Sequence, residues 1–410
     1  MLSDADTAER LTPAPPAIDG RIAVFRDELA AGLRQPLGTP ADPGAAEACF
    51  RRLLPFSRRA GITRLADLTG LDRLGLPVAQ AIQPAALSEV TSLGRGLTLM
   101  EAAVGAIMEG LERFFAERIP SSDCFLATAG ELRIDAALFE NLLLPHAGTA
   151  WRSRPIPWTL AVDVASGVPQ PVPLELVHTC YTDPEPPGDG LFIRTTTGLA
   201  CHSTARDAFA HGLFECIERD AIARAFTTHG FFDRHRIATS HIGPKVDHIF
   251  SVARTQGIAF ALWHAPSPTD LPVIWCQAIE AGAAEPTLAL PTEGHSAGIT
   301  VEAAAASAML EALSARAGAI SGARDDQTRE HYRKSTDPLV ADARRLILEA
   351  TAAGTAASPF APTCLRDVVD RVAAYGLGPV LAVPVGADAE AGVACVRTIL
   401  AGARAFSILR

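Results

Sequence analysis

Two pairs of glutamates, each followed directly by an arginine, are the residues of this chain best suited to chemistry. They are Glu109, Glu112 and Arg113 in the first copy, and Glu215, Glu218 and Arg219 in the second. Glutamates three residues apart share one face of a helix, and most side chains around both pairs are apolar, so we expect buried helices. Two buried like charges are unfavourable unless cations compensate them. One arginine per pair leaves a surplus of negative charge, which suits Mg²⁺ held jointly by carboxylates and phosphate oxygens, while the arginines can bind phosphate.

An ordinary salt-bridged helix surface is the alternative explanation for such a pattern. Charge runs on helices are usually solvated faces, and a single Glu-x-x-Glu-Arg sequence would fit that explanation well. This chain carries the sequence twice in the same context, together with a third partial copy. The repetition favours a metal and phosphate site over two unrelated surface helices.

Each copy lies in a repeated loop-helix unit. A glycine-containing loop ends at a threonine, and a glutamate follows at the same spacing each time: Thr98 and Glu109, Thr204 and Glu215, Thr300 and Glu311. Threonine is a good N-cap, and in the first copy Glu101 can complete a capping box. The loops also offer backbone N–H groups and the positive end of a helix dipole to anions. The copies are too far apart for a solenoid repeat, so we expect three units that converge on one site.

Composition narrows the class of protein. The chain has 410 residues, 48% of them hydrophobic, and a formal net charge of -10 without a long basic run. Such a chain is a poor nucleic-acid binder, since phosphate contacts need clustered lysine and arginine. Its start does not resemble a signal peptide, and no stretch is apolar enough to span a membrane. The eight cysteines are scattered without a CxxC pair, which favours free thiols and a cytoplasmic location.

Strand-like and helix-like segments alternate along the chain. Stretches rich in β-branched and aromatic residues predict strands at 159–164, 172–178, 258–264 and 273–279, with a hairpin connection at 165–169. Long alanine- and leucine-rich segments between them predict helices, so the expected fold class is α+β, or mixed α/β. We expect residues 1–45, which are rich in proline, to be a variable and largely mobile arm around one short helix at 21–33. Residues 46–410 are expected to form one domain.

Common catalytic motifs are missing from the sequence. It contains no G-x-x-x-x-G-K-[ST] loop, no strand-G-x-G-x-x-G-helix fingerprint, no G-x-S-x-G elbow and no H-E-x-x-H pair. A nucleotide site in this chain therefore has to be built differently.

Four stretches resemble YcaO-domain proteins, and three separate motifs occur in the family's order. The stretches are 62–77, 92–117, 197–221 and 294–326. The resemblance implies a single large YcaO domain whose carboxylates bind Mg²⁺ ions that hold the phosphates of ATP. Position by position, it implies metal ligands at Glu109, Glu112, Glu215 and Glu218, and nucleotide contacts from Arg113, Ser203, Asp207, Arg219 and Glu311. It implies no covalent nucleophile on the enzyme.

The chain departs from the family pattern at several positions. Asp207 stands where glutamate is usual and Ser203 where asparagine is usual, while Gly105, Ser307 and Ser314 replace serine, arginine and glutamine. The expected phosphate-contacting shell is therefore thinner than in typical members. The chain also ends without the Pro-x-Pro-x-Pro tail that many azoline-forming members carry.

The resemblance implies ATP-dependent activation of a backbone amide in a ribosomally made precursor peptide. A nucleophile attacks the carbonyl, and ATP phosphorylates its oxygen so that the oxygen leaves as phosphate; catalysis then rests on positioning and on charge neutralisation. A substrate Cys, Ser or Thr gives an azoline, the family's commonest product, and external sulfide gives a thioamide, which the missing tail favours. A nucleotide-binding scaffold subunit that has lost catalysis is the alternative from another class.

Partners follow from the length of the chain. We expect it to be too short for an additional leader-binding domain, so a leader-peptide-binding or sulfur-delivery protein is expected to present the peptide. A homodimer is also considered, whereas nucleic acid and membranes are not expected partners.

Overall fold

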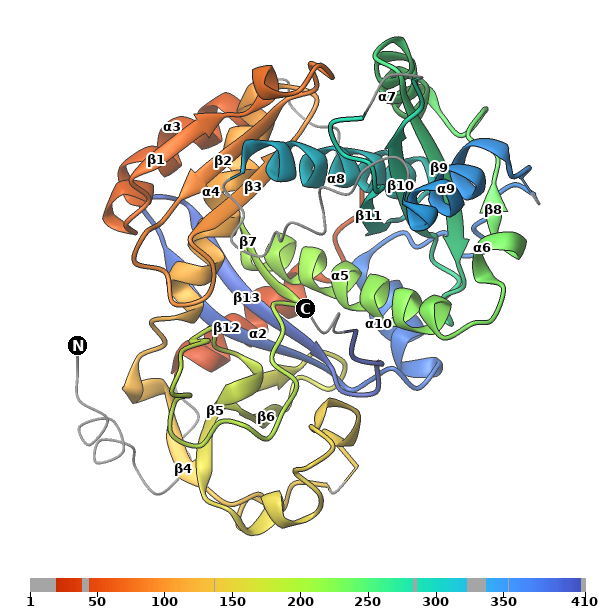
Figure 1. Cartoon of the computed structure of the whole chain (residues 1–410). Coiled ribbons are helices and arrows are strands. Elements are labelled where there is room, and N and C mark those ends of the chain that lie inside the picture. The colour runs from red at the N-terminus through yellow and green to blue at the C-terminus, as the bar shows by residue number, and fades with distance from the viewer. Residues whose placement is uncertain are drawn as a thin grey trace.

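Three antiparallel sheets carry the fold, and one long helix packs beside each (Figure 1). The computed structural model describes residues 20–38, 44–135, 137–282, 286–322, 337–352 and 354–406. Most of the proline-rich start, the end of the fourth family-like stretch at 323–326 and the last residues at 407–410 lie outside this range.

The first sheet has the strand order β1-β2-β3 and packs against helix α4, which in turn packs against α3. Its strands are β1 (Arg64–Asp67), β2 (Val78–Ile82) and β3 (Thr91–Arg95), its helices are α3 (Ala45–Arg59) and α4 (Leu99–Ala116), and η1 (Thr69–Leu71) joins β1 to β2.

The six-stranded sheet has the order β4-β5-β12-β13-β7, with β6 paired to β5. Its strands are β4 (Phe125–Ala127), β5 (Ile156–Asp163), β6 (Pro169–Pro173), β7 (Leu199–His202), β12 (Val380–Asp388) and β13 (Val393–Leu400). The helices around it are α2 (Gly20–Gly32), α5 (Ala205–Phe226) and α10 (Leu365–Ala374), and its connections contain η2 (Ser121–Asp123), η3 (Glu140–Leu142), η4 (Ala150–Ser153) and η5 (Leu174–Leu176).

The third sheet has the order β11-β10-β9-β8. Its strands are β8 (Arg236–Ile237), β9 (Ile258–Ala265), β10 (Val273–Glu280) and β11 (Thr292–Ala297). The accompanying helices are α6 (Phe231–Arg234), α7 (Pro244–Thr255), α8 (Val301–Ser321), α9 (Pro338–Arg344) and the π-helical turn η7 (Arg345–Glu349).

The mixed helix and strand content confirms the predicted fold class, and β5, β9 and β10 occupy three of the four predicted strands. The hairpin at 165–169 is confirmed too, since β5 and β6 pair antiparallel across it. The predicted strand at 172–178 is wrong beyond Pro173, where the chain turns into η5. The turn lets the buried Glu175 carboxylate accept three backbone N–H groups, from Gly190, Leu191 and Phe192.

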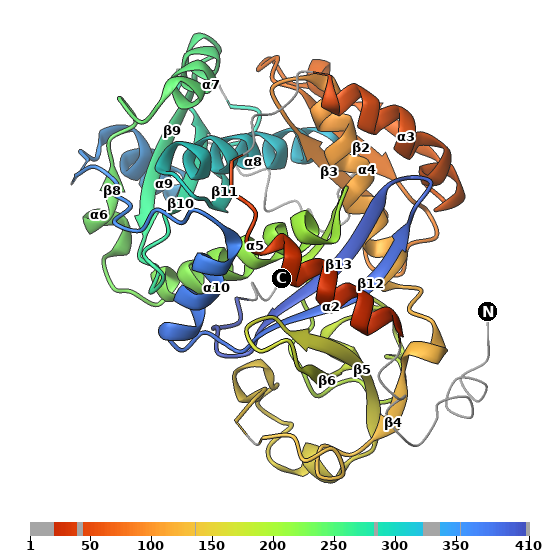
Figure 2. The same ribbon diagram turned by 180° about the vertical axis from the view of Figure 1, so that it is seen from behind.

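Helix α2 occupies the predicted position within the N-terminal arm and packs into the core. Ile22, Phe25 and Leu29 are buried, and the helix contacts α5 and β5, as the rear view shows (Figure 2). The described part of the arm is thus in close contact with the rest of the fold, while a domain boundary near residue 45 stays a prediction.

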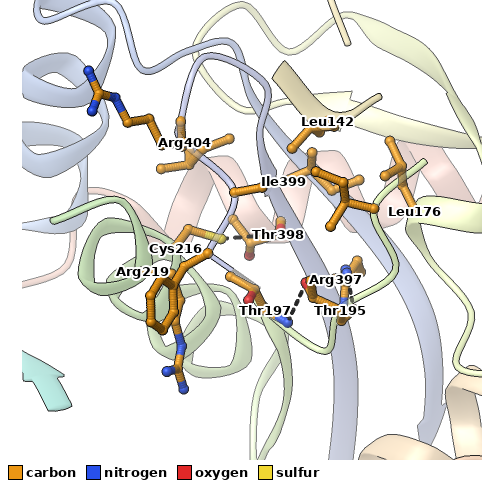
Figure 3. Close-up of a pocket in the computed structure, with 15 residues that line it drawn as sticks. Leu142, Leu176, Thr195, Thr197, Cys216, Arg219, Arg397, Thr398, Ile399 and Arg404 are labelled. Atoms are coloured by element: carbon orange, nitrogen blue, oxygen red, sulfur yellow. Dashed lines mark hydrogen bonds between the residues drawn. The ribbon is translucent and has the colours of Figure 1, made fainter. Parts of the chain in front are cut away.

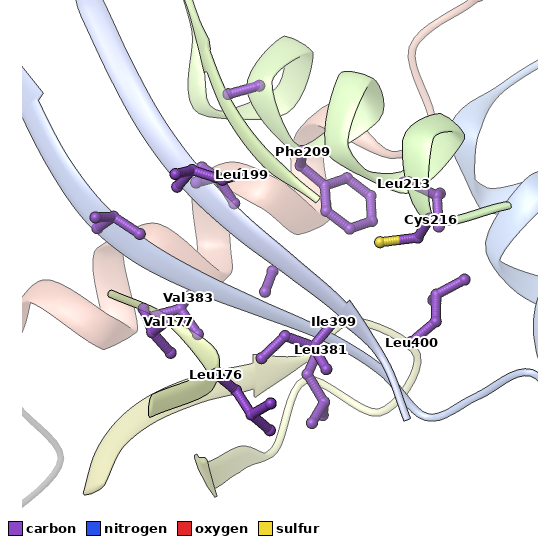
Figure 4. Close-up of a cluster of buried hydrophobic side chains, with 14 of the residues drawn as sticks. Leu176, Val177, Leu199, Phe209, Leu213, Cys216, Leu381, Val383, Ile399 and Leu400 are labelled. Carbon is purple, nitrogen blue, oxygen red and sulfur yellow. The ribbon is translucent and has the colours of Figure 1, made fainter. Parts of the chain in front are cut away.

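Helix α5 is held by its apolar side against the six-stranded sheet. Phe209, Leu213 and Cys216 from the helix meet Ile399 and Leu400 from β13 in one buried cluster (Figure 4). This packing fixes the rotation of α5 about its axis, because residues three and four apart share a face. It thereby fixes the direction in which the glutamates of α5 project.

Helices α4 and α8 lie unusually close to the strands that precede them. A Cβ added at Gly94 in β3 would lie 1.9 Å from the Ala102 carbonyl oxygen, and one at Gly294 in β11 would lie 2.2 Å from that of Ala308. Any side chain at these two positions would push strand and helix apart. The glycines of the repeated loops thus serve close packing of the unit as well as the turn into the helix.

No helix within the described part of the chain is long and apolar enough to cross a membrane.

Candidate functional site

Each repeated unit consists of a strand, a short loop and a helix capped by threonine. Thr98, Thr204 and Thr300 are the N-caps of α4, α5 and α8, and each side chain accepts the backbone N–H of the residue three positions on. Thr98 and Glu101 form the predicted capping box. The capping threonine sets the start of each helix, so the glutamate at fixed spacing reaches the same turn in every unit.

The three units form a closed ring. Helix α4 contacts β7 of the second unit, α5 contacts β11 of the third, and α8 contacts β3 of the first. Two hydrogen bonds cross between units: the Cys201 N–H donates to Glu112 Oε1 at 3.0 Å, and Arg95 Nη2 donates to Glu311 Oε2 at 3.0 Å. The predicted convergence of the three units is confirmed.

The first glutamates of the two pairs are held by the backbone of strand β3 and of the residue just before β7, respectively. The Leu93 N–H donates to Glu109 Oε2 at 3.0 Å, and the Gly198 N–H donates to Glu215 Oε2 at 3.0 Å. The Glu109 side chain is 37% exposed and that of Glu215 is 21% exposed. These carboxylates are therefore fixed in direction by one oxygen and still reachable from solvent.

The second glutamates of the two pairs, Glu112 and Glu218, are destabilised in their charged forms. Burial raises the pKa of Glu112 well above its ordinary value, and Glu109 and Glu215 add to the rise. Burial also raises the pKa of Glu218 to about 8, with Glu311 and Glu215 raising it further against the opposing effect of Arg219. The buried Oε1 atom of Glu218 has no hydrogen-bond partner among the described residues. Both carboxylates thus lack sufficient positive charge within the protein.

The two arginines of the motif differ in how far they are engaged. Arg113 is buried, and its guanidinium donates to the Glu89 and Thr91 carbonyls, to Ser92 Oγ and to the carboxylates of Glu89 and Glu109. These bonds make Arg113 a support for Glu109 and the β3 edge. A contact between Arg113 and phosphate would require several of them to break.

Arg219 is held more loosely, by ion pairs of 3.7 Å to Glu215 and 3.5 Å to Glu218. Burial alone would lower the pKa of Arg219, but Glu218, Glu215 and Glu311 outweigh it and raise that pKa. The long ion pairs leave Arg219 the better placed of the two motif arginines to meet a phosphate.

Arg95, His211 and His295 join the site without having been selected from the sequence. Arg95 pairs with Glu311 as described above. Burial lowers the pKa of His211, and Arg95 lowers it further, while Glu215 and Glu311 act in the opposite direction. Burial lowers the pKa of His295 to about 4, so this imidazole is neutral. The signals were present in the sequence, because His211 lies four residues before Glu215 on the same helix face, while Arg95 and His295 belong to the repeated loops.

Three further motif residues lie outside the charged group or are engaged elsewhere. Asp207 accepts from Thr204 Oγ1 at 2.8 Å and from Arg206 Nη1 at 2.7 Å at the start of α5. Ser203 lies beside it, with its hydroxyl 3.1 Å from His202 Nδ1. Arg316 is buried and pairs with Asp72 and Glu280 instead of Glu311, so the third copy carries no glutamate-arginine pair of the kind seen in the other two.

The donor set suits a divalent cation shared with a ligand. Five glutamates (Glu109, Glu112, Glu215, Glu218 and Glu311) face three arginines (Arg95, Arg113 and Arg219), so carboxyl groups outnumber cations, and burial favours the protonated forms of Glu112 and Glu218. Within the described ranges no three acidic, histidine or cysteine side chains form a group that could hold a metal by themselves. Mg²⁺ usually keeps one or two protein carboxylates and completes its shell with phosphate oxygens and water. Pairs of carboxylates with excess charge fit that requirement.

A pocket with about 60 Å³ of space for water-sized molecules opens beside Arg219 (Figure 3). It is lined by α5, by the loop that leads into β7, and by β13 with the segment after it. The lining residues are Leu142, Leu176, Ile193, Thr195, Thr197, Cys216, Arg219, Arg397, Thr398, Ile399, Leu400, Ala403, Arg404, Ala405 and Phe406. The pocket is thus mostly apolar and touches the charged group through one arginine.

A family model matches most of the chain. The model described as YcaO cyclodehydratase, ATP- and Mg²⁺-binding, matches residues 93–404. An uncharacterised protein of Methanothermobacter thermautotrophicus is 33% identical over 284 residues, which is 66% of this chain and 70% of that protein. A protein of Rhizobium leguminosarum bv. trifolii, named for its place in the tfuA 3′ region, is 29% identical over 86% of each chain.

Solved structures share the fold. YcaO from Methanopyrus kandleri, bound with AMPPCP and Mg²⁺, is 22% identical with a TM-score of 0.63 and covers 88% of this chain and 94% of that one. A heterocyclase in complex with substrate and cofactor is 16% identical with a TM-score of 0.68, and the match spans 93% of this chain but 56% of that one. The E. coli microcin synthetase McbBCD complex is 14% identical with a TM-score of 0.58, over 82% of this chain and 87% of that one. The expectation of ATP and Mg²⁺ as cofactors is confirmed at the level of the family.

Proposed function

Because the chain belongs to the YcaO cyclodehydratase family, whose activity is ATP-dependent peptide modification, we propose that it activates a backbone amide of a ribosomally made precursor peptide at the ring of three units. The observation that carries the proposal is the surplus of carboxylates over arginines on α4 and α5, where burial raises the pKa values of Glu112 and Glu218. Such a group has a physical reason to exist when cations and phosphates complete it.

Glu109, Glu112, Glu215 and Glu218 are the proposed metal ligands. Glu109 and Glu215 each have their Oε2 atom fixed by a backbone N–H, and their Oε1 atoms face Arg113 at 3.0 Å and Arg219 at 3.7 Å respectively. Bound Mg²⁺ supplies positive charge that neutralises the phosphates of ATP. Glu112 and Glu218, whose pKa values are raised by burial, would lose their protons when that charge arrives.

The nucleotide contacts divide into direct and supporting ones. Arg219 is the proposed direct phosphate contact, since its two ion pairs are long. Glu311 holds Arg95 at the third corner of the ring, and Ser203 offers a hydroxyl at the loop before α5. Arg113 and Asp207 are proposed to act through the residues that they hold, namely Glu109 and the N-terminus of α5.

The product that we favour is an azoline, formed when a Cys, Ser or Thr of the peptide attacks the preceding carbonyl. The alternative product is a thioamide, formed with a sulfur-delivery partner. The heterocyclase and the microcin synthetase that share this fold are described with substrate and as a complex respectively, which supports a substrate and partner proteins here. A peptide substrate and a partner that binds the leader peptide or delivers sulfur are part of the proposal.

A scaffold subunit without catalysis is the second candidate, and one observation favours it. Arg113 and Asp207, two of the expected nucleotide contacts, are engaged by residues of the chain itself. This reduces the number of groups free to meet ATP.

The test measures ATP hydrolysis and the mass of candidate precursor peptides, with and without proteins encoded beside this one. Loss of water from the peptide indicates an azoline, and replacement of oxygen by sulfur indicates a thioamide. We expect turnover with the partner present and little without it, because misplacing the amide by about 1 Å can cost on the order of a hundredfold in rate. ATP binding without turnover under every combination would support the scaffold function instead.

A further inference from the structure

The buried guanidinium of Arg397 lacks an ionic partner. Arg397 lies on β13 and is 4% exposed, and its Nη2 donates to the Thr195 carbonyl at 2.7 Å. Its Nε and Nη1 atoms have no hydrogen-bond partner among the described residues, and no ion pair with a carboxylate of these residues involves it. Removing an unpaired charge from water is costly, and no counter-charge from the described residues offsets this cost for Arg397.

Three acidic side chains of the segment before β7 have partners other than Arg397. Glu175 accepts three backbone N–H groups, Asp189 pairs with His178 at 3.2 Å, and Glu185 pairs with Arg194 at 2.7 Å. Burial raises the pKa of Tyr181 although Arg397 and Arg194 act against it, so this phenol is neutral and does not supply an anion. None of these carboxylates forms an ion pair with Arg397.

Arg397 lines the pocket that also reaches Arg219. In the antiparallel pairing of β13 with β7, Arg397 stands opposite Leu199, directly beside the loop of the second unit. Thr195 and Thr197 of that loop line the pocket with it (Figure 3). Leu176, Ile193 and Phe406 contribute apolar wall. The pocket thus combines one buried cation that lacks an ionic partner with a largely apolar surface, next to an arginine of the charged ring. Arg404 also lines the pocket, but its side chain is exposed to solvent.

We propose that this pocket binds a carboxylate of the peptide substrate, with Arg397 as its anchor; the proposal rests on the peptide-modifying function proposed above. One unpaired guanidinium matches the single charge of a carboxylate. A phosphate carries more charge and would need further donors beside Arg397, and the guanidinium of Arg219 faces Glu215 and Glu218, where the nucleotide is proposed to bind. The apolar wall suits the rest of an amino acid. Arg397 is a specificity residue here, because it would contact substrate away from the reacting amide.

The carboxylate can come from an acidic side chain or from the C-terminus of a peptide, and four probes separate the possibilities. They are N-acetyl-leucyl-aspartic acid α-amide, in which only the side-chain acid is free, N-acetyl-leucyl-leucine with a free C-terminus, its neutral amide, and inorganic phosphate. Each is titrated into the full chain without ATP or Mg²⁺, with binding followed by saturation-transfer NMR. We expect at least one acid to bind about tenfold more tightly than the neutral amide, the size of effect that one charge-assisted contact supplies.

The variant Arg397→Met should abolish this preference, while the matched surface variant Arg345→Met should keep it. The acid that binds identifies the source of the carboxylate. Equal binding of acid and neutral peptides, or retention of the preference in Arg397→Met, would overturn the proposal. Phosphate binding that depends on Arg397, without peptide binding, would overturn it too, since the pocket would then hold phosphate.

Thermal unfolding provides a second test, which applies even if Arg397→Met folds less well than the parent chain. Replacing an unpaired buried charge by an apolar side chain of similar length is often neutral or stabilising, so the melting temperature of Arg397→Met should equal or exceed that of the parent chain. A marked fall would show that Arg397 is a structural partner and would overturn the proposal. The rise in melting temperature with ATP and Mg²⁺ should persist in Arg397→Met; its absence from the parent chain would count against the proposed function and leave the peptide titrations unaffected.

Discussion

Replacing Glu218 with glutamine tests whether the glutamate ring is strained by its own charge. The pKa of Glu218 is raised from 4.5 to about 8 by burial and by Glu311 and Glu215, against Arg219. Between these two values the folded chain keeps a proton that the unfolded chain has lost, so the free energy of unfolding falls as the pH rises through this window. Glutamine keeps the shape of the side chain and removes the ionisation.

The magnitude follows from the two pKa values. Their difference sets a ceiling of about 5 kcal/mol on the destabilisation by ionised Glu218 at pH 8. The variant also removes one of the two ion-pair partners of Arg219, which costs part of that gain. We therefore expect Glu218→Gln to unfold with a free energy on the order of 2 kcal/mol higher than the parent chain at pH 8, and with little difference near pH 5.

The assay is urea unfolding at pH 5 and pH 8, without nucleotide or metal. The matched control is Glu390→Gln, since the Glu390 side chain is 84% exposed and should leave the stability at both pH values unchanged. The free energy of unfolding of Glu218→Gln should still depend on pH to some extent, because burial also raises the pKa values of Glu109 and Glu112. A Glu218→Gln variant that is less stable than the parent at pH 8 would refute the reasoning, since it would show that the ionised carboxylate is fully compensated by the protein.

Three further outcomes are expected. ATP with Mg²⁺ should raise the melting temperature of the chain by linkage of binding to folding, and an unchanged value at millimolar concentrations of both would contradict the nucleotide site. Glu215→Gln and Glu218→Gln should each lose ATP turnover while keeping the fold by circular dichroism; near-normal turnover in both would rule out a metal role for these residues. Gly94→Ala should destabilise the chain by about 3 kcal/mol or prevent folding, because its Cβ would lie 1.9 Å from the Ala102 carbonyl oxygen and overpacking has costs of this order; Gly70→Ala, where a Cβ meets open space, is the control, and equal stability of the two variants would be inconsistent with the close packing of β3 on α4.

Helix periodicity and capping explain why the core of the site could be predicted from the sequence. Thr98, Thr204 and Thr300 fix the starts of three helices, and constant spacing then places one glutamate on the same turn of each. The closed ring of three units is harder to predict from the sequence, since contacts such as that of Arg95 with Glu311 join residues far apart along the chain. Sequence patterns carry little information on such contacts, because tertiary packing decides which side chains meet.

For a related reason, the sequence could not predict which partners each charged residue has in the folded chain. The same Glu-x-x-Glu-Arg pattern gives an enclosed Arg113, engaged by Glu89 and two carbonyls, and a loosely paired Arg219. The difference comes from what packs opposite each helix. Likewise, Arg397 carries no local motif, and its position beside Thr195 depends on the pairing of β13 with β7.

Charge is distributed unequally over the three units of the ring. The third unit has Ser314 where the other two have a second glutamate, and its Glu311 is paired with Arg95, so this corner is close to neutral. The first unit has Arg113 beside Glu109 and an uncompensated Glu112, and the second has Glu218 with a free buried oxygen. The excess negative charge therefore lies on α4 and α5, which is where cations with phosphates would be drawn. Arg219 stands between that charge and the apolar pocket of Arg397. A nucleotide approaching Glu112 and Glu218 and a peptide lying against Arg397 would meet at Arg219, which is the arrangement that phosphorylation of an amide oxygen requires.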